Sequence, residues 1–83
     1  MSTADYGEIL EEVRRLLGRV VKSPVRIEEK TELVNDLGLD SLAALQLVEE
    51  VEDAFDISFP LNELSQIRTV RDFVLQIQQE IEA

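Results

Sequence analysis

The residues best suited to chemistry lie in residues 36–42, with the sequence DLGLDSL. Asp40 is a good N-cap for a helix that begins at Ser41, and Gly38 permits a backbone turn just before it. A serine in the first turn of a helix faces free backbone N–H groups and the positive end of the helix dipole, where a phosphate is well accommodated. The alternative interpretation is that this segment is only a loop leading into a helix, without a chemical role. The dipeptide Asp-Ser alone would favour this structural interpretation.

The composition limits what Ser41 can do by itself. The 83 residues contain no cysteine and no histidine. Thiolate chemistry, most transition-metal sites and the usual base of a nucleophilic serine are therefore excluded. We expect no metal site and no enzyme activity of the chain itself, and Ser41 is better interpreted as the substrate of another enzyme.

Charge is distributed unevenly along the chain. There are 18 acidic and 8 basic residues, which gives a net charge of -10. Such a surface repels nucleic acid and anionic lipid and favours basic protein surfaces as partners. No basic residue occurs between Lys30 and Arg68, whereas nine acidic residues do, namely Glu32, Asp36, Asp40, Glu49, Glu50, Glu52, Asp53, Asp56 and Glu63.

Apolar residues spaced by three or four predict three longer helices. The first covers residues 4–21, with Ser2 or Thr3 as candidate N-cap, and the third follows a Thr69 N-cap. A short helix is expected between Pro60 and Thr69. The core stripe of the second helix is expected to contain Ala44, Leu47, Val48, Val51, Ala54 and Phe55.

These elements predict an all-α fold, a small four-helix bundle formed by one domain over residues 1–83. No segment alternates long enough for a strand. Residues 22–40 form a long first loop. A loop of this length in so small a domain normally indicates either a function or an error in the assignment of the helices. Its apolar residues Val25, Ile27, Leu33 and Leu37 can hold it across the helices.

A helical wheel of the second helix separates two leucines from the core stripe. The sector outside the core contains Leu42, Leu45, Glu49, Glu52 and Asp56, with Ser41 at its edge. Two leucines beside a serine on an acidic face are poorly explained by packing. A small apolar area rimmed by charge is a reasonable docking surface.

Four segments form a pattern of fixed spacing, namely GLDSL at 38–42, its lead-in Leu33 and Asp36-Leu37, FDISFP at 55–60, and Thr69-Val70. Together they resemble the acyl carrier protein family. The similarity spans nearly the whole chain, is strongest from about Thr31 to Val74, and is weakest in the first helix. Asp-Ser-Leu alone is a weak motif, but its combination with these spacings is specific.

The resemblance implies a four-helix bundle that carries 4′-phosphopantetheine on Ser41. A phosphopantetheinyl transferase would move this group from coenzyme A, assisted by Asp40. The thiol of the arm would carry acyl thioesters to acyl-loading, elongating or acyl-transfer enzymes with basic docking patches, in fatty acid, lipid or polyketide biosynthesis. The docking face would consist of Leu42, Leu45, Gln46, Glu49, Glu52, Asp53 and Asp56.

Three positions depart from the commonest fatty-acid carriers. Ala43 replaces a frequently polar residue, Gln46 stands where an acid is common, and Glu49 where an apolar residue is common. These departures favour a specialised pathway as much as a housekeeping one.

Two alternative functions remain at this stage. One is a carrier of aminoacyl or peptidyl groups with the same attachment chemistry, and the other is an unmodified helical adaptor. We also expect a cytoplasmic monomer without membrane insertion, since the sequence shows neither an apolar run of membrane-spanning length nor a signal peptide.

Overall fold

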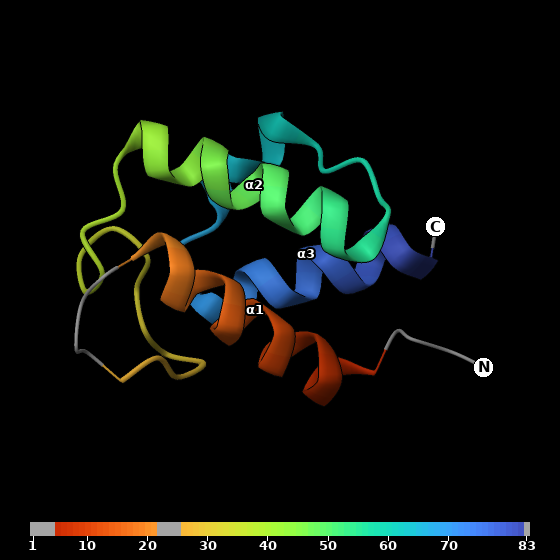
Figure 1. The fold of residues 1–83 in the computed structure, drawn as a ribbon, viewed down its shortest axis with the longest axis horizontal. Coiled ribbons are helices and arrows are strands. Elements are labelled where there is room, and N and C mark those ends of the chain that lie inside the picture. Colours follow the sequence, from red (N-terminus) through yellow and green to blue (C-terminus); the bar gives the residue numbers. More distant parts are fainter. Residues whose placement is uncertain (1–4, 22–25, 83) are drawn as a thin grey trace.

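The computed structural model describes residues 5–21 and 26–82. It contains helix α1 (Tyr6–Val20), helix α2 (Ser41–Phe55), the short 3-10 helix η1 (Leu61–Gln66) and helix α3 (Val70–Glu82). Three longer helices, one short helix and a long first loop were predicted, and all are confirmed. In Figure 1, α1 runs from right to left, whereas α2 and α3 run from left to right. α1 packs against both of the other long helices.

Helix α1 begins later than the sequence indicated. Its N-cap is Asp5, whose carboxylate accepts a hydrogen bond from the backbone N–H of Glu8 at 3.3 Å. The candidate caps Ser2 and Thr3 lie outside the described residues. An aspartate is as good a cap as a serine, so the first turn of helix forms directly after Asp5.

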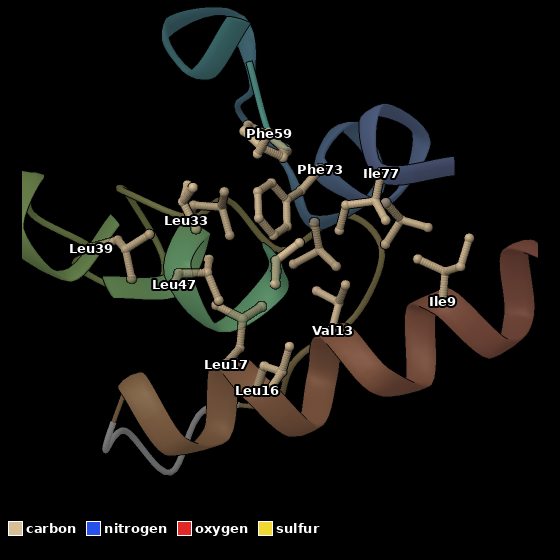
Figure 2. Packing of buried hydrophobic residues seen from close by; sticks show 14 of the residues in the cluster. Ile9, Val13, Leu16, Leu17, Leu33, Leu39, Leu47, Phe59, Phe73 and Ile77 are labelled. Carbon is tan, nitrogen blue, oxygen red and sulfur yellow. The ribbon is translucent and has the colours of Figure 1, made fainter. Parts of the chain in front are cut away.

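The core is formed by apolar side chains of all three long helices and of the connecting segments (Figure 2). Phe73 of α3 is fully buried and packs against Phe59, with ring centroids 5.2 Å apart. Leu16 of α1 is buried as well. Burial of each such side chain contributes about 1.5–3 kcal/mol.

The core stripe of α2 is narrower than predicted. Leu47, Val48 and Val51 are buried, whereas Ala54 is exposed, so its assignment to the core was wrong. Ala54 lies in a hollow that is also lined by Glu8 and Glu12 of α1. Acidic side chains favour water over burial, which is consistent with the exposure of Ala54 beside them, whereas the next residue Phe55 is partly buried against the core.

The first loop is held to the core by apolar side chains, as expected. Leu33 and Leu37 are buried and Ile27 is partly buried, while Val25 lies outside the described residues. Leu39 is also buried, which the sequence analysis did not predict.

Backbone hydrogen bonds fasten the loop to the start of α3. Leu33 N–H donates to the carbonyl of Arg68 at 2.9 Å, and Val70 N–H donates to the carbonyl of Thr31 at 2.9 Å. They belong to an isolated antiparallel bridge between Glu32 and Thr69, and the described residues contain no longer strand. The long loop is therefore an ordered connection over residues 26–40.

Thr69 caps α3 as predicted. Its hydroxyl accepts a hydrogen bond from the N–H of Asp72 at 3.2 Å, and the Asp72 carboxylate accepts from the N–H of Thr69 at 3.2 Å. This reciprocal pair is a capping box. The backbone hydrogen bond from Thr69 lowers the pKa of Asp72, because it favours the charged carboxylate.

Candidate functional site

The turn before α2 is built by local hydrogen bonds. The Asp36 carboxylate accepts from the N–H of Glu32 at 2.8 Å, and Gly38 N–H donates to the carbonyl of Val34 at 2.9 Å. Gly38 has φ of 68°, in the left-handed region that favours glycine. The turn predicted at Gly38 is confirmed, and it leads the chain into α2.

Asp40 and Ser41 form the start of α2. The Asp40 carboxylate accepts a hydrogen bond from the N–H of Ala43 at 2.8 Å, which confirms Asp40 as the N-cap. Ser41 is the first residue of the helix and is exposed. Ser41 therefore belongs to the first turn of the helix, where free N–H groups and the helix dipole stabilise negative charge.

The residues around Ser41 do not include the usual base of a nucleophilic serine. The sequence contains no histidine, and the carboxylate of its neighbour Asp40 is engaged with the helix backbone. Within residues 5–21 and 26–82, no cluster of three or more His, Cys, Asp or Glu side chains could hold a metal ion. An accessible hydroxyl without a base is suited to modification by another enzyme.

Two leucines lie exposed beside this hydroxyl, as the wheel predicted. The exposed fraction is 77% for Leu42 and 46% for Leu45. Such large apolar side chains on a charged helix are typical of an interaction surface. Leu61 of η1 and Val34 of the first loop are also exposed, and the sequence analysis did not single them out.

The acidic residues of α2 fall into two groups. Glu49, Asp53 and Asp56 are exposed, and the structure records no side-chain hydrogen bond or ion pair that joins them to another described residue. Gln46 is exposed as well.

The second group of acidic residues serves the fold. Glu50 forms an ion pair with Arg19 of α1 at 3.7 Å, and the Glu52 carboxylate accepts the N–H of Phe59 at 2.8 Å. The hydrogen bond of Glu52 was missed because it joins residues seven positions apart, beyond the reach of helical periodicity. Glu52 therefore holds the chain after α2 in place.

A small helical bundle that presents an exposed, capped serine on an acidic helix has the arrangement of a carrier domain. The family model for the phosphopantetheine attachment site matches residues 8–77. This chain therefore belongs to the acyl carrier protein family, and it carries acyl groups on a phosphopantetheine arm.

Relatives cover the chain almost completely. An acyl carrier protein of Streptomyces coelicolor is 36% identical, over 99% of this chain and 91% of the relative. The anthracycline acyl carrier protein DauA of Streptomyces sp. strain C5 is 31% identical, over 100% of this chain and 98% of its own. A solved structure, a putative acyl carrier protein from Mycobacterium tuberculosis, superposes with a TM-score of 0.77 at 33% identity, covering 83% of this chain and 93% of that one.

None of the helices described is long and apolar enough to cross a membrane.

Proposed function

We propose that Ser41 is the attachment site of the phosphopantetheine arm. The supporting observation is its position as the first, exposed residue of α2 directly after the Asp40 cap. A phosphodiester on this hydroxyl lies at the helix N-terminus, where the dipole stabilises its charge. The arm supplies the thiol that the chain lacks, and the chain itself only carries and presents the thioester.

The mass of the protein after incubation with coenzyme A and a phosphopantetheinyl transferase tests this assignment. Wild type should gain the mass of one phosphopantetheine group, and Ser41→Ala should gain none while keeping its helical circular dichroism. Ser58→Ala and Ser65→Ala are matched controls, because both serines are exposed but lie outside α2. A modified Ser41→Ala protein would refute the assignment and favour another serine. Unmodified wild type would favour the adaptor function.

Asp40 has two separable roles in this proposal. Its carboxylate caps α2. We infer that its charge also assists the transfer to Ser41. Asp40→Asn keeps a side-chain oxygen that accepts from Ala43 N–H, so the helix should retain its stability to within a few tenths of a kcal/mol. Modification should nevertheless slow, because the charge beside the hydroxyl is lost. Equal modification rates for Asp40→Asn and wild type would leave Asp40 with the capping role alone.

We further propose that one monomeric domain docks onto basic patches of the transferase and of acyl-loading, elongating or acyl-transfer enzymes. Leu42 and Leu45 are the apolar anchors, and Gln46, Glu49, Asp53 and Asp56 form the polar rim. Glu52 belongs to this docking face by position, but its carboxylate is engaged with Phe59. Reversal of Glu52 therefore changes the fold and the surface together, and Glu49 is the cleaner test.

The docking face is tested by the transferase rate as a function of salt. Glu49→Lys should lower the rate and flatten its salt dependence, since rim charges act on association. Glu82→Lys makes the same charge change at the exposed end of α3 and is the control. Leu45→Ala should weaken binding with little effect on the salt slope. Identical rates and slopes for Glu49→Lys and Glu82→Lys would contradict the docking face.

The cargo is a fatty acyl or polyketide chain in this proposal. The relatives include general acyl carrier proteins and one named for an anthracycline. Mass spectrometry of the thioester on protein from its native host distinguishes these cargoes. An aminoacyl or peptidyl thioester would instead support the alternative carrier function.

A further inference from the structure

A second charged surface lies away from α2. Arg14 of α1, Arg26 and Lys30 of the first loop, and Arg71 of α3 line one pocket, to which α2 contributes no residue. Half of the eight basic residues of this acidic protein thus gather at one place. We call these four residues with Leu10 and Ile27 the basic pocket. In Figure 1, residues 26–30 lie at the lower left, below α1, whereas α2 lies at the top.

The cations of the basic pocket are only partly neutralised. Arg14 pairs with Glu11 and Arg26 pairs with Glu28, each at 3.2 Å and each on the surface. No ion pair within residues 5–21 and 26–82 involves Lys30 or Arg71. Exposed ion pairs contribute little, so a ligand can compete for the paired arginines as well.

Hydrogen bonds fix the frame of the pocket. Arg71 N–H donates to the carbonyl of Glu29 at 3.0 Å, which joins α3 to the first loop. The Tyr6 hydroxyl donates to the Glu29 carboxylate at 2.5 Å, which joins α1 to the same loop. The three elements that supply the cations are therefore held together before any ligand binds, so binding requires little ordering of the backbone.

The lining indicates which anion fits. Glu28 and Glu29 also line the pocket, and they oppose a compact, doubly charged anion such as phosphate. Leu10 and Ile27 are partly buried and offer an apolar floor. A protein segment with spaced carboxylates and one apolar side chain can pair its carboxylates with the cations and pack its apolar side chain against Leu10 and Ile27. Because its charges are spaced, they need not lie next to Glu28 and Glu29.

We propose that the basic pocket is a second docking surface, which binds an acidic protein segment carrying an apolar side chain. Its charge is complementary to a partner that the acidic docking face on α2 would repel. The two surfaces therefore select partners of opposite charge. This proposal is independent of the attachment site, because no residue of α2 takes part.

The test uses the full chain, labelled with ¹⁵N, and a synthetic peptide of sequence Ac-EDLDE-NH₂, which has one apolar side chain between acidic residues. Titration should shift the amide signals of Leu10, Arg14, Ile27, Lys30 and Arg71 and leave those of α2 in place. Added sodium chloride should weaken the binding, because the contacts are ionic.

Two double variants of equal charge change provide the control. Lys30→Gln/Arg71→Gln removes the two cations of the basic pocket that form no ion pair with a described residue, and we expect the peptide to bind about tenfold more weakly. Arg15→Gln/Arg19→Gln removes two cations of α1 that do not line the pocket, and it should bind the peptide like wild type. Circular dichroism checks that both variants keep the fold.

Several results would overturn the proposal. Equal weakening by both double variants would mean a general charge effect, and shifts confined to α2 would mean another site. The same shifts with inorganic phosphate at equal concentration would mean a small-anion site. The same shifts with phosphatidylglycerol vesicles would mean a membrane surface. Shifts that depend on protein concentration without peptide would mean self-association, and no shifts at all would mean no binding.

Discussion

The first turns of α2 and α3 are both closed by an N-cap side chain, but their surroundings differ. α3 begins with a complete capping box, Thr69 and Asp72, and its next residues Val70 and Phe73 are fully buried. α2 begins with half a box, because Asp40 caps it but Ala43 occupies the place of Asp72. Its first residue Ser41 is exposed where Val70 is buried.

The difference shows how one small domain separates stability from chemistry. The start of α3 is joined to the first loop by backbone hydrogen bonds and is closed to solvent at Val70 and Phe73. The start of α2 is held by a single side-chain cap and leaves its hydroxyl accessible. Substitutions at the start of α3 should therefore change unfolding alone, whereas substitutions at the start of α2 should also change modification.

The largest effect is expected from Phe73→Ala. Removal of a fully buried aromatic side chain in contact with Phe59 should cost about 3–5 kcal/mol of unfolding free energy. Urea denaturation followed by circular dichroism measures it. Leu75→Ala on the same helix is the control, since Leu75 is 41% exposed and its removal should cost much less. An equal loss of unfolding free energy at the two positions would mean that the start of α3 is not closed to solvent at Phe73.

The caps should give the next largest effects, and they sharpen the comparison. Thr69→Ala and Asp40→Ala should each lower the unfolding free energy by about 1 kcal/mol, because each removes one N-cap side chain. Only Asp40→Ala should also slow phosphopantetheine transfer, measured on folded protein by mass spectrometry. Slower transfer to Thr69→Ala would show that the two helix starts are coupled.

The titration of Asp72 should give a smaller effect with a defined sign. Its pKa is lowered in the folded state, so its contribution to stability is present above its unfolded pKa of about 4 and is lost as pH falls through the folded value. The stability difference between wild type and Asp72→Asn should shrink below pH 4. The comparison of these two proteins isolates the contribution of the Asp72 carboxylate. A difference that stays constant down to pH 2 would contradict the lowered pKa.

The smallest effect is expected from completing the box at α2. In Ala43→Gln the new side chain can accept the N–H of Asp40, as Asp72 accepts that of Thr69, and it should add a few tenths of a kcal/mol. Thermal unfolding followed by circular dichroism measures the gain. Ala54→Gln introduces the same side chain at an exposed position far from the cap and serves as the reference. A gain at Ala54 equal to that at Ala43 would point to helix propensity instead of capping.

Periodicity and capping chemistry predicted the elements well because both are local. The helix that begins at Ser41, the Thr69 cap and the exposed Leu42 and Leu45 all depend on residues within four positions of one another. The position of Ser41 as an exposed first residue could therefore be predicted from the sequence. Its chemical role came from the resemblance to a family.

The features that were missed depend on distant contacts. Ala54 has the spacing of a core residue, but it is exposed and lies beside Glu8 and Glu12 of another helix. Glu52 lies in the surface sector of a helical wheel, but its carboxylate accepts the N–H of Phe59, where the chain returns to α2. The basic pocket unites three segments whose cations are scattered in the sequence.

The bridge between Glu32 and Thr69 also bears on how fast the protein folds. It joins residues 37 positions apart, and α2 and η1 lie between them. Closing a loop of this length costs chain entropy before the two hydrogen bonds and the buried Val70 offset it. Contacts between α1 and α3, at opposite ends of the chain, add to the mean sequence separation. The protein should therefore fold more slowly than a helical bundle whose neighbours in space are neighbours in sequence.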